Sequence, residues 1–99
     1  MTVNVHLFPL GRVLATSGVV ARLGDLGLDL HGALDPYLAR HAAADWGELD
    51  RDYQATNDWA VVFGDERLLS AFRLADTTRI WVITEADRSA TTVLLPEEY

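Results

Sequence analysis

Two residues with the spacing of a catalytic or metal-binding pair lie near the middle of the chain, His41 and Asp45. Four positions apart on a helix, an imidazole and a carboxylate can act as a general base with its orienting acid, or as two metal ligands. His41, however, shares a helical stripe with Tyr37 and Leu38, a pattern typical of a face turned toward the core. We therefore favour a hydrogen-bonded core histidine over a catalytic or metal-binding one.

A second group of polar residues surrounds the loop between the last two expected strands. Its charged and hydroxyl side chains could form a small active site or a recognition surface: Arg67, Glu85, Asp87, Arg88 and Thr91. The same composition is ordinary at hairpin ends, where ion pairs hold a loop down and each pair contributes little. We favour this structural interpretation, and we expect Arg67 to lie near Glu85.

The third feature is an acidic segment, residues 45–66, with seven acidic residues and one arginine, so it carries −6 of the net charge of −7. Trp46 lies among its first acids, and two interpretations stay open. The tryptophan could fill the core as the chain reverses, or it could be an exposed protein-binding hot spot. Trp59 and Trp81 are assigned to core or sheet packing. The candidate partner-binding residues are Asp45, Trp46, Glu48, Asp50, Asp52 and Asp58.

Composition excludes several classes of protein. The 99 residues contain no cysteine and no lysine, which excludes disulfide frameworks, thiolate metal sites, Schiff-base catalysis and a P-loop lysine. The histidines do not have metal-ligand spacing, and no serine lies in a nucleophile motif. We expect no cofactor and no metal. The acidity also argues against direct binding of a nucleic-acid backbone, which needs a basic surface.

The expected location is the cytoplasm. The first six residues lack a basic region, and the apolar stretch that follows is interrupted by Pro9 and Gly11. This pattern predicts neither a signal peptide nor a membrane-spanning helix. The absence of cysteine agrees with a reducing compartment.

The elements expected to position these residues are a strand, helices and three further strands. Asp35-Pro36 is a strong helix start, because proline at the first helical position loses only an N–H that has no partner. Asp50 can cap the next helix, which should stop before Gly64. The expected strands are 12–16, 68–74, 80–84 and 91–95, and the expected helices are 17–23, 36–44 and 51–61.

This order of elements predicts an α+β fold in a single small domain, residues 1–99. An N-terminal strand and two to three helices would precede a three-stranded antiparallel meander. In the expected register Phe72 pairs with Trp81, and Leu68 lies opposite Glu85.

Five stretches of the chain carry a resemblance: Phe8–Thr16, Arg40-His41, Asp45–Leu49, Leu68–Phe72 and Ile80–Tyr99. In these stretches the chain resembles a family of small bacterial proteins that occur on plasmids, integrative elements and prophages. Some members carry the label of a type I restriction methyltransferase subunit. Residues 24–34 depart from the family pattern. The resemblance covers nearly the whole chain and implies an accessory protein of mobile elements, with no catalytic residues to carry over.

The methyltransferase label does not fit the residues. A methyltransferase needs a cofactor-binding sheet domain and a glycine-rich first loop, and this chain is too short for that domain.

Two hypotheses about function remain. The favoured one is a non-enzymatic protein that binds a protein, or a protein–nucleic acid complex of host defence, through its acidic surface. The alternative is a small enzyme or ligand-binding domain at Glu85, Asp87 and Arg88, with His41. A homodimer is also considered, because Leu94-Leu95 could form an edge strand that pairs with a second copy.

Overall fold

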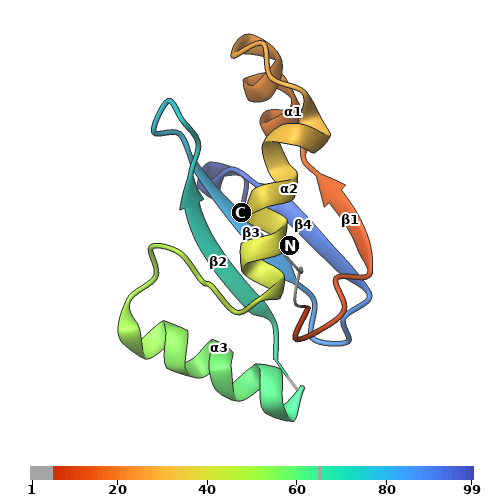
Figure 1. Ribbon diagram of the computed structural model, residues 1–99, viewed down its shortest axis with the longest axis vertical. Coiled ribbons are helices and arrows are strands. Elements are labelled where there is room, and N and C mark those ends of the chain that lie inside the picture. Colours follow the sequence, from red (N-terminus) through yellow and green to blue (C-terminus); the bar gives the residue numbers. More distant parts are fainter. Residues whose placement is uncertain (1–5, 65) are drawn as a thin grey trace, which may run out of the picture.

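A mixed sheet with two helices on one face and a third helix beside its β2 edge organises the molecule (Figure 1). The structure is a computed structural model that describes residues 6–64 and 66–99. The elements, in chain order, are β1 (Arg12–Ala15), α1 (Ser17–Asp25), α2 (Leu30–Ala42), α3 (Arg51–Phe63), β2 (Leu68–Arg73), β3 (Arg79–Thr84), β4 (Ala90–Leu94) and the 3-10 turn η1 (Pro96–Glu98). The predicted α+β class is confirmed.

Local capping signals explain where two of the helices begin. The Thr16 hydroxyl accepts a hydrogen bond from the Val19 backbone N–H at the start of α1. Asp50 caps α3 as expected, by accepting from the Tyr53 N–H, and Gly64 ends that helix with a φ of +70°. Both caps satisfy backbone groups that the helix itself leaves unpaired.

The expected start of α2 at Pro36 is wrong. The helix begins at Leu30, where the Asp29 carboxylate accepts from the Gly32 N–H, and Pro36 lies inside it. Proline costs the helix one backbone hydrogen bond. The additional turns bury Leu34, and the packing of that side chain on the core offsets the loss.

The sheet has the strand order β1-β4-β3-β2. Strands β2, β3 and β4 form the predicted antiparallel meander, and β1 adds to it in parallel beside β4. The sheet is therefore mixed rather than purely antiparallel. Strand β4 lies inside the sheet between β1 and β3, so the expected edge strand at Leu94-Leu95 is wrong.

The expected register of β2 and β3 is wrong by one residue. Phe72 pairs with Ile80 rather than Trp81, and Leu68 lies opposite Thr84 rather than Glu85. The cause is the turn, in which Thr77 adopts a φ of +70° and the Leu74 N–H donates to the Thr78 carbonyl. A shift of one residue moves side chains to the other face of a sheet.

Helices α1 and α2 cover one face of the sheet and form the main core with it. The buried members of that core are Val19, Leu23, Leu34, Phe72, Leu74, Ile80, Val82 and Val93. A second buried cluster joins Phe8, Trp46, Ala60 and Leu68 beneath α3. Figure 1 shows α3 on the β2 side of the sheet and β1 on the opposite side. No helix within the described residues is long and apolar enough to cross a membrane.

Candidate partner-binding surface

The first acids of the acidic segment are paired with arginines. Asp45 accepts from Arg40, with 2.7 Å between Oδ2 and Nε, and Glu48 accepts from Arg73 at 2.8 Å. The hydrogen bond from Arg40 holds the pKa of Asp45 below its usual range. Both pairs are about half exposed, so each contributes little to stability but neutralises an acid locally.

Two other acids of the segment serve the fold directly. Asp50 caps α3, and Asp58 accepts from the indole N–H of Trp46 at 2.9 Å. Trp46 itself is only 2% exposed, so the interpretation of this residue as an exposed hot spot is wrong and the core interpretation holds. Its ring packs beneath α3, and its N–H donates to the Asp58 carboxylate, as a buried indole requires. Asp52 stays exposed in the first turn of α3, and Asp65 lies outside the described residues.

The acidic segment also covers the outer edge of β2. The Ala71 N–H donates to the Trp46 carbonyl at 3.1 Å, and the Ala71 carbonyl accepts from Glu48 at 2.7 Å. Two residues earlier in β2, the buried side-chain amide of Asn57 donates to the Leu69 carbonyl at 2.7 Å and accepts from the Leu69 N–H at 3.3 Å. These contacts give β2 the hydrogen bonds that a neighbouring strand would supply.

Sequence reasoning missed this covering role of the segment. The available signal was Gly47, which lies between Trp46 and Glu48 and adopts a φ of +71°. A Cβ atom at this position would overlap the Ala71 carbonyl oxygen, so the close approach to β2 requires glycine.

The polar loop is a structural tie between the β3–β4 turn and the end of α3. The Arg88 guanidinium donates to four backbone carbonyls, those of Ala60, Glu66, Glu85 and Ala86. With its N–H groups bonded to four backbone carbonyls, the guanidinium serves to hold the fold together rather than to bind a ligand.

The other members of the polar loop have separate contacts. Arg67 lies near Glu85 as expected, with 3.9 Å between Nε and Oε1. Asp87 accepts from the Ser89 side chain and backbone, which lowers the pKa of Asp87. Thr91 is buried and donates to the Leu10 carbonyl. These groups do not converge on one point where a substrate could bind.

His41 heads a buried chain of hydrogen bonds that crosses the sheet. Its Nδ1 contacts the Ser70 hydroxyl, and its Nε2 lies 2.9 Å from Thr84 Oγ1, which lies 2.7 Å from Thr91 Oγ1. The chain ends where Thr91 donates to the carbonyl of Leu10.

The carbonyl at the end of the chain fixes the direction of the hydrogen bonds back to Nε2 of His41. A carbonyl only accepts, so Thr91 donates to it and accepts from Thr84, which in turn accepts from Nε2–H of His41. Nε2 of His41 therefore carries a proton, and while the ring is neutral its Nδ1 accepts from Ser70. Burial, with a smaller contribution from the charge of Arg88, lowers the pKa of His41 to about 4.

The histidine is closed off from solvent. Phe8 and Trp46 pack edge-on against its ring, with centroids 5.3 and 5.5 Å away. This arrangement agrees with the favoured interpretation of His41 as a hydrogen-bonded core residue. Asp45 bonds to Arg40 instead, so the pairing of His41 with Asp45 does not form.

The largest exposed apolar side chains of α3 share its outer face. Trp59 is 61% exposed, Val62 75% and Phe63 58%, and the rings of Trp59 and Phe63 pack at an angle of 35° with centroids 4.1 Å apart. The inner face of the helix buries only small or polar residues, Asn57 and Ala60. The expectation that Trp59 packs in the core or against the sheet is wrong, because the hydrogen bonds of Asn57 to Leu69 fix which side of α3 faces inward.

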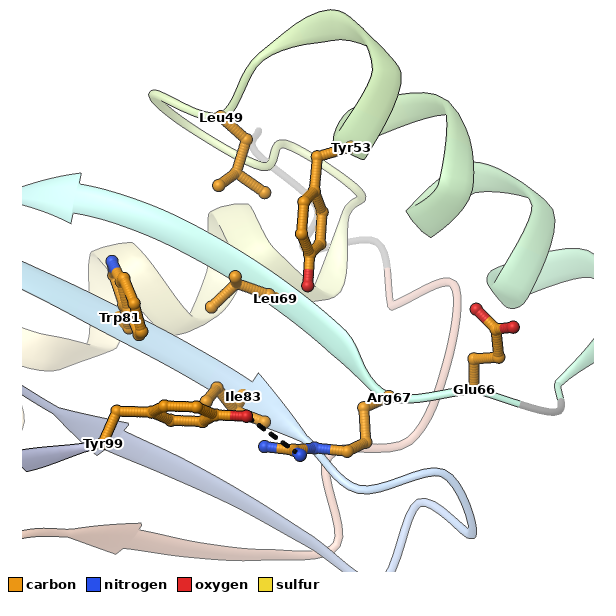
Figure 2. A pocket seen from close by; sticks show the side chains of 8 residues that line it. All are labelled: Leu49, Tyr53, Glu66, Arg67, Leu69, Trp81, Ile83 and Tyr99. Carbon is orange, nitrogen blue, oxygen red and sulfur yellow. Dashed lines mark hydrogen bonds between the residues drawn. The ribbon is translucent and has the colours of Figure 1, made fainter. Parts of the chain in front are cut away.

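A groove lies between α3 and the face of the sheet that α1 and α2 leave uncovered (Figure 2). Its volume is about 460 Å³, and its lining residues are Leu49, Tyr53, Glu66, Arg67, Leu69, Trp81, Ile83 and Tyr99. Figure 2 shows Tyr53 extending from α3 toward the sheet, and Arg67 beside the Tyr99 hydroxyl at 3.2 Å. Trp81 packs on Tyr99 with centroids 5.6 Å apart, so its assignment to sheet packing holds.

Helix α3 therefore presents apolar side chains both to solvent and to this groove, next to the exposed acids Asp52 and Glu66. A surface of this kind suits a partner with apolar residues and basic flanks. No protein-family model matches the chain, and neither the curated proteins nor the solved structures give a significant match, so its kinship with the mobile-element family stays a prediction.

Proposed function

We propose that this protein is a non-enzymatic binding protein that engages a protein partner through the outer face of α3. The observation that supports this proposal is the exposure of Trp59, Val62 and Phe63 on a helix whose buried face carries smaller side chains. Burying three large apolar side chains against a partner would remove them from water, which is the main driving force of association.

The charge around α3 selects the kind of partner. Asp52 lies on the same outer face, two turns before Trp59, and Glu66 follows the helix. The acidic segment adds a long-range negative field that attracts basic surfaces and speeds association. The partner we propose is a protein with apolar residues between lysines or arginines.

A nucleic-acid-handling complex fits this description, since its phosphate-binding surface is basic. The resemblance to mobile-element proteins supports such a host target. In this proposal the protein is an accessory factor of a mobile element that acts against host defence. Among the described acids of the segment, Asp52 and Glu66 remain free to meet the partner, because Asp45, Glu48, Asp50 and Asp58 already serve the fold.

The proposal can be tested with a defined probe. A synthetic amphipathic helix of leucine and lysine should bind and shift the fluorescence of Trp59 to shorter wavelength, whereas a leucine–glutamate helix of equal apolar content should not. The double variant Trp59→Ala/Phe63→Ala should weaken binding at least tenfold, measured by calorimetry. Asp52→Lys should weaken it several-fold at low salt and less at high salt.

The matched control is Val20→Ala, which removes an exposed apolar side chain of α1 that is 47% exposed. It should leave binding unchanged. Equal binding of both probe helices, or full binding by the double variant, would contradict the proposal. In cells, a photo-crosslinker at position 59 should capture a basic host protein that the same crosslinker at position 20 does not.

A further inference from the structure

The outer edge of β1 is uncovered among the described residues. The N–H of Arg12 donates to Ser89 and that of Thr16 to Val93, so the even-numbered residues of β1 point their backbone groups at β4. Backbone directions alternate along a strand, so Val13 and Ala15 point theirs away from the sheet. No hydrogen bond among the described residues pairs them, and Val13 is 48% exposed.

An apolar groove runs beside this edge. Its volume is about 300 Å³, and helix α2 contributes Leu30, Leu34 and Leu38 to its wall. These leucines recur every four residues and form one row along the helix. They lie on the same side of the sheet as the side chains of Val13 and Ala15, so a strand added to β1 would place alternate side chains on them.

We propose that a second copy of this chain occupies the edge, with the two β1 strands antiparallel about a two-fold axis at Leu14. In that register Val13 pairs with Ala15 of the other copy and vice versa, which gives four backbone hydrogen bonds and one continuous sheet. The two Leu14 side chains, 40% exposed in one chain, face each other across the axis. Arg12 lies opposite Thr16, so no like charges meet along the strands.

The distribution of charge favours a second copy over an unrelated partner at this edge. Residues 1–44 contain three arginines and three aspartates, so the part of the chain that carries β1 and α2 is neutral. The acidic segment lies on the β2 side of the sheet (Figure 1), away from the proposed axis.

The interface is small, because β1 has four residues. We therefore expect reversible self-association with a dissociation constant on the order of 10–100 µM rather than a permanent dimer. Sedimentation equilibrium across that concentration range should show a monomer–dimer equilibrium.

A charge swap at the axis tests the register. Leu14→Lys and Leu14→Asp should each abolish self-association, because two like charges would face each other at the closest pair of the ladder. An equimolar mixture of the two variants should form a heterodimer. The mixture keeps the test informative, since a variant that failed to fold could not restore association.

A second variant tests the hydrogen bonds. Val13→Pro removes an N–H that points away from β4 and should weaken association at least tenfold, whereas Val13→Thr keeps it and should not. Ala75→Lys, a charge placed on the exposed turn between β2 and β3, is the control and should leave association unchanged. A protein that stays monomeric throughout, or variants of Leu14 that dimerise as the native chain does, would overturn the proposal.

Discussion

The two edges of the sheet differ in what their backbone groups contact. At the β2 edge, Leu69 and Ala71 each have both backbone groups bonded, to Asn57 and to the segment around Gly47. At the β1 edge, the backbone N–H and carbonyl groups of Val13 and Ala15 point away from β4, and no described residue forms a hydrogen bond with them. Exposed strand edges invite pairing with other chains, and proteins usually cover them.

The difference gives a structural role to four acids of residues 45–66. This segment closes one edge with its backbone and with Asn57, and its acids hold the covering chain in place through Arg40, Arg73 and Trp46. The docking of α3 on β2 through small residues leaves Trp59 and Phe63 outside. The covered edge and the exposed helix face are therefore consequences of the same packing.

The largest effect on this comparison should come from Gly47→Ala. The added Cβ would overlap the Ala71 carbonyl oxygen, and the alanine would have to keep a φ of +71°. Both effects displace the covering segment from β2. We expect a loss of about 3 kcal/mol or more in the free energy of unfolding, measured in urea. Gly27→Ala is the matched control, since its φ is +68° but a Cβ there meets open space, and it should cost about 1 kcal/mol. Equal losses in the two variants would contradict the close approach.

Acid should weaken the covered side through His41. Its pKa of about 4 in the fold lies below the ordinary value of 6.5, so the unfolded chain takes up the proton first as the pH falls. The stability from this residue is present above pH 6.5 and is lost progressively toward pH 4, about 3 kcal/mol in all.

The pH prediction can be checked by NMR and by mutation. The His41 ring should stay neutral, with the proton on Nε2, throughout the range from pH 5 to pH 8. His41→Gln should flatten the pH dependence of the unfolding free energy between pH 4 and 6.5. A ring that titrates near pH 6.5 in the folded protein would contradict the sealed chain of hydrogen bonds.

Asn57→Ala should cost about 2–3 kcal/mol. The variant leaves the Leu69 N–H and carbonyl without their partner at a site where Asn57 is fully buried. Thr56→Ala, one position earlier on the exposed side of α3, should change stability by less than about 0.5 kcal/mol. Thermal and urea unfolding of the two variants give the comparison, and a small loss for Asn57→Ala would show that the β2 edge does not need covering.

The smallest effect is expected from proline at the β1 edge. At concentrations where the protein is monomeric, Val13→Pro removes an unpaired N–H and should cost less than about 1 kcal/mol. Ala71→Pro removes the N–H that donates to Trp46 and should cost clearly more. Similar losses for the two prolines would mean that the edges are equally covered.

Local signals predicted much of the fold, because they act within a few residues. The Asp50 cap, the Gly64 stop and the meander all follow from neighbouring side chains. The parallel pairing of β1 with β4 joins residues nearly eighty positions apart, and the side-chain pattern of a strand does not name its neighbour. The predicted register of β2 and β3 was wrong because of the turn at Thr77, which adopts a positive φ that no sequence rule for threonine anticipates.

The candidate site was predictable in part. The sequence located the acidic segment and the proximity of Arg67 to Glu85. It left Trp46 open between the core and the surface, and it wrongly assigned Trp59 to core or sheet packing. The burial of both residues depends on how α3 docks. That docking is set by the contact of Asn57 with Leu69, which no local pattern encodes.

Hydrogen exchange of individual backbone amides tests the difference between the two edges most directly. The amides of Leu69 and Ala71 should exchange slowly at every protein concentration, since both donate to partners within the chain. Those of Val13 and Ala15 should exchange rapidly in dilute solution and slow down as the concentration rises. Equal protection of all four amides in dilute solution would contradict the account.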